Sequence, residues 1–454
     1  MNRHASDANE PMPKTSTPLK DAVAARVADD LAYLDALYRH WHAHPELSLQ
    51  EEHTSTRIAA ELRLAGLEVT CKVGGHGVVG VLRNGEGPVV MLRTDMDALP
   101  VKEQTGLSYA SAARARDDQG NEVGVMHACG HDAHMTVFVG AARQLARLKE
   151  HWSGTLVLVA QPAEERMLGA RAMLADGLFT RHPKPDCCLG LHVSPTLPAG
   201  TVGLVEGHAF ANVDSVDILV RGVGGHGAFP QAAKDPVVLA AELVLALQTI
   251  ISRETSPLEP AVITVGSIHG GAQRNVIPEA VLLQLTVRSF SQEVRAKLLH
   301  AIERTACGLA AATGLPNHCA PVVTVSDEST PAVRNDPALT QRLRDTFEWW
   351  LGKANVLSSA PVMGGEDFAR YGRTAEAIPL CFYWLGAVSP ARLLAANQAD
   401  QPLPPLHSPR FAPEPLITIQ TGVTTMAAAV LELMPKVIDC HGRLLRTATG
   451  DRNH

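Results

Sequence analysis

One nine-residue stretch concentrates side chains that can bind a metal. Residues 126–134 read Met-His-Ala-Cys-Gly-His-Asp-Ala-His, at a point where an extended segment is predicted to turn into a helix. Cys and His are the ligands that hold zinc-like ions in proteins. A helix start with a buried cysteine and solvated histidines would also explain the segment. Further ligand types at strand ends elsewhere in the chain favour the metal site.

A pair of adjacent glutamates is the second chemical signal. Glu164 and Glu165 follow Gln161-Pro162-Ala163 at the end of a predicted strand, 155–160, that is apolar on both faces. Neighbouring residues at a strand end point in different directions, so one carboxylate can bind a metal while the other takes a proton from water. An exposed acidic turn is the alternative, and a fully apolar strand before the pair makes it less favoured.

Two more apolar strands end in functional groups. The strand at 89–93 runs into Asp95 and Asp97, and the strand at 187–193 contains His192. Ligands of open α/β sheets bind outside the carboxyl ends of the strands, so these groups should converge with the Cys/His cluster. A carboxylate at a strand end often orients a histidine, so we expect Asp95 to support a ligand rather than to be one.

Several other polar residues would be ordinary surface groups on their own. They are His226 in the glycine-rich loop 224–230, Arg274 and Asn275 before Val276-Ile277-Pro278, Arg288 at a strand end, Glu366 in the acidic loop 363–368, and His407 in a proline-rich stretch. Glycines on both sides of His226 suggest a presented side chain, but only weakly. The sequence alone gives none of these residues a role.

The order of predicted elements indicates an α/β protein with an inserted α+β domain. Strands and helices alternate up to about residue 205, as in a sheet covered by helices on both faces. A β-α-β-β-α-β order then follows, which is the split, ferredoxin-like pattern. Its predicted elements are the strand 213–220, the helix 235–253, the strands 262–268 and 281–288, the helix 292–312 and the strand 321–325.

We therefore divide the chain into four parts. Residues 1–20 form a polar, proline-containing tail. Residues 21–205 and 326–445 form the two parts of a catalytic domain, and residues 206–325 form the inserted domain. A length of 454 residues, more than one hydrophobic core usually supports, agrees with two domains.

Composition narrows the class of protein. The net charge is −7 and there is no long basic run, which argues against nucleic acid or an anionic membrane as partner. None of the eight cysteines forms a Cys-x-x-Cys pair, so a reducing compartment is the better assignment. No secretory h-region and no run of about 18 apolar residues is evident. We expect a soluble, cytoplasmic protein.

Eight segments in the same order resemble a known family. The chain is similar to the co-catalytic metallopeptidases and amidohydrolases that include hippurate hydrolase, bacterial N-acyl-amino-acid amidohydrolases and auxin-conjugate (IAA-amino acid) hydrolases. The resemblance covers about residues 25–440. It rests on the motifs 44–48, 93–100, 129–131, 161–165, 190–192, 274–278, 364–368 and 406–407.

The resemblance implies a metallo-exopeptidase-like catalytic domain with a mixed sheet, and an inserted domain that acts as a lid and in dimerisation. It also implies two divalent ions per subunit (Zn, Mn, Co or Ni) and a homodimer or homotetramer. The implied metal ligands are Cys129 (bridging), His131, Glu165, His192 and His407. The implied catalytic residues are Glu164, as base and acid, and His226, which polarises the substrate carbonyl. Asn275, Arg288 and Glu366 fall at substrate-binding positions.

We therefore predict hydrolysis of the amide bond of an N-acyl amino acid. Two alternatives remain open at this point. One is a dipeptidase or a deaminating aminohydrolase with the same metal pair, and the other is a metal-binding protein without catalysis. Arg166-Met167-Leu168 stands where many relatives carry small glycine-rich residues, a change that would reshape the acyl pocket.

Overall fold

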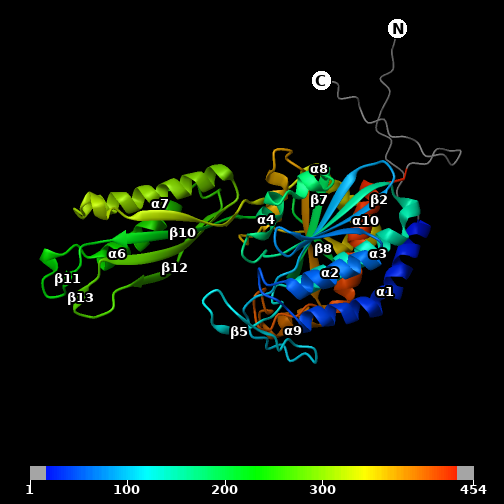
Figure 1. The fold of residues 1–454 in the computed structure, drawn as a ribbon, viewed down its shortest axis with the longest axis horizontal. Coiled ribbons are helices and arrows are strands. Elements are labelled where there is room, and N and C mark those ends of the chain that lie inside the picture. The colour runs from blue at the N-terminus through cyan, green and yellow to red at the C-terminus, as the bar shows by residue number, and fades with distance from the viewer. Residues whose placement is uncertain (1–16, 437–454) are drawn as a thin grey trace, which may run out of the picture.

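In the computed structural model, which describes residues 17–436, the chain folds into two bodies (Figure 1). Residues 1–16 of the predicted tail therefore lie outside the described residues. So do residues 437–445, the end of the predicted catalytic domain, which include Cys440. Residues 17–20 belong to the first helix, which begins before the predicted start at Asp21. The seven described cysteines are all free.

The larger body is built on an eight-stranded mixed sheet. In spatial order the strands are β1 (Glu68–Val73), β2 (Gly77–Asn84), β6 (Gly154–Gln161), β3 (Val89–Asp95), β7 (Cys187–Pro198), β18 (Leu380–Val388), β8 (Val202–Leu204) and β17 (Val356–Ser358). The four central strands, β6, β3, β7 and β18, run parallel to one another, as do β8 and β17. The pairs β1–β2, β2–β6 and β18–β8 are antiparallel.

Helices cover both faces of this sheet, as the alternation of strands and helices predicts. Alternate strand residues face two separate cores, so that Leu156 and Leu158 pack on one side and Val157 and Val159 on the other. The helices of the first side are α1 (Thr17–Ala43), α2 (Glu52–Leu64), α3 (His131–Arg147), α8 (Pro337–Leu351) and α10 (Pro415–Leu433). The second side holds α4 (Gly169–Ala175), α5 (Leu178–Arg181) and η6 (Asp367–Arg373).

The second body has a four-stranded antiparallel sheet with its own core. Its strands are β12 (Ala261–Gly270), β14 (Ala280–Ser289), β10 (Asn212–Arg221) and β15 (Val322–Thr330), in that spatial order. One face of the sheet packs against α6 (Pro236–Thr249), continued by a π-helical turn at Ile250–Glu254, and α7 (Gln292–Ala312). This order confirms the predicted ferredoxin-like arrangement, because the two helices link strands that are not neighbours in the sheet.

Short elements join and extend the two bodies. β9 (Gly207–Phe210) and β16 (Val333–Asn335) pair beside the larger sheet, so the four-stranded sheet itself spans 212–330. β11 (Gly225–His226) and β13 (Val276–Ile277) pair at the far end of the second body (Figure 1). The remaining elements are the hairpin of β4 (Arg114–Arg116) and β5 (Glu122–Gly124), the helix α9 (Pro390–Ala399), and the 3-10 turns Lys149–His151, Pro230–Ala232, Asn317–Cys319 and Lys353–Asn355.

Two helical stretches have the length and hydropathy that a membrane span requires, Pro236–Glu254 and Pro415–Leu433. The second is α10, which is mostly buried in the core of the larger body. Burial explains its apolar sequence without a membrane. The first, on α6, keeps apolar side chains exposed, including Leu245 at 73%.

Candidate metal centre and active site

The carboxyl ends of the sheet strands bring the predicted ligands together. His192 lies on β7, and Glu164 and Glu165 stand in the turn that follows β6, after Pro162 and Ala163. Cys129 and His131 stand at the start of α3, and His407 lies in the loop before α10. The side-chain ligand atoms fall in overlapping groups of three whose members lie within 4.8 Å of one another: Cys129/His131/His192, Cys129/Glu165/His407 and His131/Glu164/Glu165.

The start of α3 depends on a glycine. Gly130 caps the helix with φ +82°, a left-handed conformation that side chains other than glycine rarely adopt. A Cβ there would lie 2.5 Å from Val193 Cγ2. Gly130 therefore lets the helix start approach β7, which places Cys129 Sγ 3.3 Å from His192 Nε2.

Two histidines of the cluster, His131 and His192, are oriented through one ring nitrogen. His131 Nδ1 lies 2.8 Å from the backbone oxygen of Asp97, and His192 Nδ1 lies 2.8 Å from that of Val193. A ring that donates Nδ1–H to a carbonyl keeps a lone pair on Nε2, which is the arrangement of a metal-bound histidine. His407 Nε2 lies 3.3 Å from Cys129 Sγ and 3.4 Å from a Glu165 oxygen.

The donor set fits a divalent cation. His131 Nε2 and Glu165 Oε1 are buried and have no hydrogen-bond partner among the described residues. Buried polar atoms rarely remain unpaired, and these two, which lie within 4.8 Å of each other, fit the ligand shell of a cation. In the protein alone, burial and the nearby carboxylates raise the pKa of the Cys129 thiol well above its usual range. A bound dication would reverse that shift, because a coordinating thiol is deprotonated.

Glu164 lies beside this cluster in a strongly acidic environment. One of its oxygens is 3.9 Å from His131 Nε2, and the side chain is buried. Burial, with the charges of Glu366, Glu165 and Asp367, raises its pKa well above the usual range. A carboxyl group with a raised pKa can both accept and release a proton near neutral pH.

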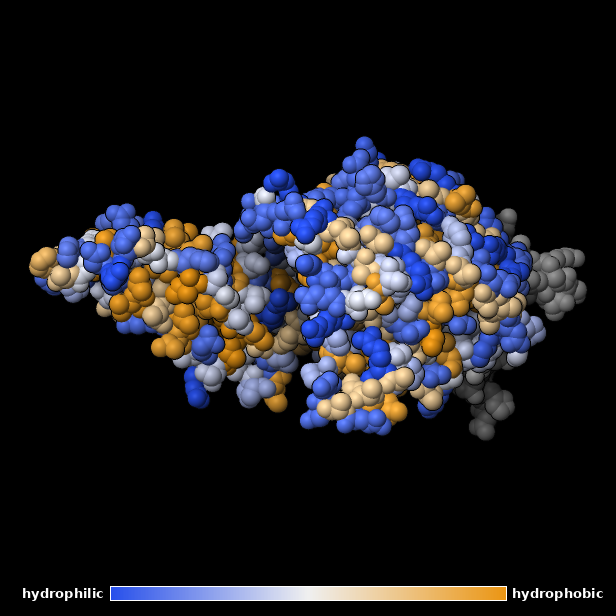
Figure 2. Space-filling view, turned by 90° about the horizontal axis from the view of Figure 1, so that it is seen from below, coloured by the Kyte–Doolittle hydropathy of each residue, from blue (hydrophilic) through white to orange (hydrophobic). Residues whose placement is uncertain are grey.

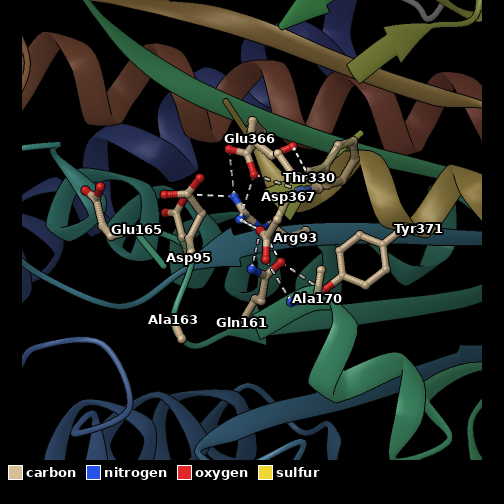
Figure 3. A network of polar contacts seen from close by, with 12 residues as sticks. Arg93, Asp95, Gln161, Ala163, Glu165, Ala170, Thr330, Glu366, Asp367 and Tyr371 are labelled. Carbon is tan, nitrogen blue, oxygen red and sulfur yellow. Dashed lines mark hydrogen bonds and ion pairs between the residues drawn. The ribbon is translucent and has the colours of Figure 1, made fainter. Parts of the chain in front are cut away.

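A buried arginine lies beside the acidic group that Glu164 forms with Glu366 and Asp367. Figure 3 shows Arg93 enclosed by Asp95, Gln161, Glu366 and Asp367, with donor–acceptor distances of 2.7 Å to Asp95 and 2.9 Å to Glu366. Arg93 cannot bind a metal, and its guanidinium instead forms ion pairs with three buried carboxylates, those of Asp95, Glu366 and Asp367.

Asp95 contacts Arg93 and two histidines at the start of α3. Its Oδ1 lies 2.7 Å from His134 Nδ1, and its Oδ2 accepts from Arg93 and stands 3.7 Å from His131 Nε2. His134 Nε2 in turn accepts from the backbone N–H of Val193 on β7. The chain Asp95–His134–Val193 thus ties β3 to the strand that carries His192. The sequence placed His134 in the Cys/His cluster but could not show this contact.

The ligand cluster opens into a cavity of about 880 Å³ between the two bodies. Glu164, Glu165, Cys129, His192 and His407 line its polar end, and Ser194, Thr196, Ser358 and Ser359 add hydroxyl groups. Its apolar wall consists of Met167, Leu197, Phe210, Val362, Trp384 and Leu406. Trp384 lies next to His192 in the register of β18 and β7, and the sequence analysis did not identify it. The apolar run Leu380–Val388 could have indicated its strand.

The predicted substrate-binding residues lie in three different environments. Arg288 lines the cavity from β14 and donates to the backbone oxygen of Met363. Glu366 is buried against Arg93 rather than at the cavity wall. Asn275 is exposed beside β13, and His226 is exposed on β11, at the far end of the second body (Figure 1). A single copy in this arrangement does not bring His226 to the described cavity.

Comparison with known proteins agrees with this geometry. Residues 91–400 match the model of peptidase family M20/M25/M40. The chain belongs to this family. N-acetyl-L-cysteine deacetylase of Bacillus subtilis is 37% identical over 78% of this chain and 80% of its own length. IAA-amino acid hydrolase ILR1-like 2 of Arabidopsis thaliana is 36% identical over 76% of this chain and 74% of its own.

A solved structure adds a metal-binding relative. The structure of a dinuclear metal binding peptidase of the M20 family from Bacillus subtilis matches with a TM-score of 0.69 and 29% identity. The match covers 91% of this chain and 100% of the chain of that structure. The family resemblance drawn from the eight motifs is therefore confirmed.

Proposed function

We propose that the protein hydrolyses the amide bond of N-acyl amino acids, releasing a carboxylic acid and an amino acid. One observation carries the proposal: inward-facing histidine nitrogens, a thiol and a carboxylate surround one centre beside Glu164, whose carboxyl group is poised to exchange a proton. The family relatives that cleave N-acyl amino acids support it.

Cys129, His131, Glu165, His192 and His407 would hold two divalent ions, with Cys129 shared between them. Zinc, manganese, cobalt and nickel all suit such a donor set, since affinity alone does not select among them. When bound, the ions polarise a carbonyl oxygen and lower the pKa of a water molecule.

Glu164 then acts as base and acid. Its carboxylate takes the proton of the attacking water, and the resulting acid delivers that proton to the leaving amine. The position of the carboxyl group suits both steps, because it lies at the edge of the cluster, with one oxygen 3.9 Å from His131 Nε2, and lines the cavity. The apolar wall formed by Trp384, Phe210 and Met167 excludes water and gives the acyl group a surface to pack on.

Arg288 is the proposed partner of the substrate carboxylate. Its Nε donates to Thr286 and its Nη1 to a backbone carbonyl, and it carries a positive charge into the wall of the cavity. Asn275 and Glu366 remain proposed substrate-binding groups. Asn275 would have to approach by movement of the second body, and Glu366 would act through Arg93.

His226 is proposed to stabilise the tetrahedral oxyanion, after closure of the second body or from a second copy. Exposed apolar side chains on the second body support a dimer through that body. Figure 2 shows hydrophobic residues gathered there, and the exposed ones include Val237, Val238, Leu245 and Ile268. The free cysteines support our proposal of a cytoplasmic location.

The test is amine release from a panel of N-acyl amino acids, hippurate included, with purified protein. The protein is first chelated and then supplied with each metal in turn, with Glu164→Gln in parallel. We expect metal-restored hydrolysis that Glu164→Gln lowers by at least about 100-fold. Near-full turnover by Glu164→Gln would remove the proposed base. Turnover of dipeptides or of a non-amide C–N substrate alone would replace the proposed substrate class with that of the alternatives.

A further inference from the structure

The turn that carries Glu164 and Glu165 is held in a strained conformation. Ala163 and Met167 have φ values of +49° and +55°, in the left-handed region that non-glycine residues rarely adopt. Such a conformation is unfavourable for residues other than glycine and persists only where surrounding contacts enforce it. Within the turn, the backbone N–H of Met167 donates to the backbone carbonyl oxygen of Glu164 at 2.7 Å, and that of Leu168 to the backbone carbonyl oxygen of Ala163 at 3.1 Å.

Two buried carboxylates from distant segments hold the same turn from outside. Glu51 Oε1 accepts from the backbone N–H of Ala163 at 2.8 Å, and Asp97 Oδ2 accepts from that of Glu165 at 3.0 Å. These two amides stand on either side of Glu164. Both carboxylates are almost fully buried, at 0% and 1% exposure. Figure 3 shows the positions of Ala163 and Glu165 on this turn.

Each of the two carboxylates is itself fixed by a second contact. Glu51 Oε1 also accepts from the N–H of Leu49, and Asp97 Oδ2 also accepts from Ser48 Oγ at 2.6 Å. Leu49 has φ +68°, so the segment before α2 is bent to bring Glu51 inward.

A purely structural role does not explain the carboxyl group of Glu51, because burying it is energetically unfavourable. Its Oε2 is buried without a partner among the described residues. An unpaired buried polar atom is destabilising, so a methionine of similar length would pack here more favourably. A need for the other oxygen, at the Ala163 amide, explains why a carboxyl group is present.

We infer that Glu51 and Asp97 are positioning residues that fix the main chain on both sides of Glu164. This inference rests on the proposed role of Glu164 as base. The pair of hydrogen bonds from the Ala163 and Glu165 amides to Glu51 and Asp97 is called the brace below. The brace keeps the Glu164 carboxylate beside the proposed metal ligands, while Glu165 faces His131 and His407. A misplacement of about 1 Å can lower a rate by about 100-fold, so the brace acts on kcat rather than on substrate binding.

Glu51 is the better site for the test, because Asp97 also contacts His131 and its loss would disturb a metal ligand. Glu51→Gln keeps an oxygen that can accept from Ala163 N–H, whereas Glu51→Met keeps the length and removes the acceptor. We expect Glu51→Met to lower kcat by about 10- to 100-fold with KM and metal content within about twofold of wild type. Glu51→Gln should stay within about threefold of wild type in kcat.

Hydrogen exchange gives a readout that does not depend on turnover. In a peptide that spans 161–168, Glu51→Met should speed exchange by at least about tenfold relative to Glu51→Gln, because the Ala163 amide loses its acceptor. Unchanged kcat and exchange in Glu51→Met would overturn the brace, as would loss of metal in place of loss of kcat. If the wild type cleaves no amide while the exchange difference is present, the brace stands and the proposed function falls.

Discussion

A buried histidine that does not line the cavity allows a quantitative test of the electrostatics. His42, at the end of α1, places Nδ1 2.6 Å from Asp132 and Nε2 3.0 Å from Glu103. All three side chains are at most 1% exposed. Both ring nitrogens face carboxylates, so the ring is stable here as the cation, and these partners raise its pKa from 6.5 to about 10 against the opposing effect of burial.

The sign of the pH dependence follows from the raised pKa. The stabilisation is fully present below the unfolded pKa of 6.5 and is lost as pH rises through about 10. With about 1.4 kcal/mol for each pH unit, it amounts to at most about 5 kcal/mol at pH 6.5, about 3 kcal/mol at pH 8 and well under 1 kcal/mol at pH 10. The pKa values of Asp132 and Glu103 are lowered, so their share is present above their ordinary pKa and is lost as pH falls through the lowered values.

His42→Gln keeps hydrogen-bonding atoms but removes the charge. We expect a loss of about 3–5 kcal/mol in the free energy of unfolding near pH 6.5, shrinking steadily toward pH 9.5. Urea unfolding of chelated protein at several pH values measures it, which separates the effect from metal binding. His53→Gln, an exposed histidine on α2, is the control and should show no such trend. A loss that is equal at pH 6.5 and 9.5 would refute the reasoning.

Three further predictions concern the core and the site. Arg93→Met leaves three buried carboxylates without the arginine cation and should lower the free energy of unfolding by about 3–5 kcal/mol. Arg93→Lys keeps a charge and should recover part of this loss. Thermal melts of the two variants test the prediction, and equal melting temperatures would contradict the role of the charge. Gly365→Ala would place a Cβ 2.4 Å from Val213 Cγ2 and should lower the free energy of unfolding by about 1–3 kcal/mol. Gly364→Ala is the control and should leave that free energy nearly unchanged, because its Cβ would meet no atom closer than 3.7 Å. A similar loss in both variants would show that the structure relieves the crowding at Gly365. Cys129→Ser replaces the proposed shared thiolate and should lower bound metal per chain, measured by elemental analysis after dialysis, while full metal content would remove Cys129 from the ligand set.

The sequence was most informative where a local pattern meets a strong physical constraint. Strands buried on both faces need continuous apolar runs, and the run at 155–160 therefore predicted β6, whose carboxyl end carries Glu164 and Glu165. The β-α-β-β-α-β order of the inserted segment likewise predicted the second sheet, because few arrangements accommodate that order. The density of Cys and His at 126–134 indicated the metal cluster before any geometry was known.

Contacts between distant segments were beyond any local pattern. Glu51 and Ala163 are 112 residues apart, and the pairing of Arg93 with Glu366 spans 273 residues. Residue type alone cannot distinguish a carboxylate that binds substrate from one that neutralises a buried arginine. For Glu366 only the packing of η6 against the sheet decides between them.

What the sequence determined by itself is the set of chemical groups and the strand ends at which they stand, since periodicity and residue type are properties of short segments. The tertiary structure decided how those groups face one another. It turned the Nε2 atoms of His131 and His192 inward through backbone carbonyls, and it bent the turn at Ala163 onto Glu51. It also left His226 at the far end of the second body. Orientation depends on the packing of elements remote in sequence, and that packing exists only in the folded chain.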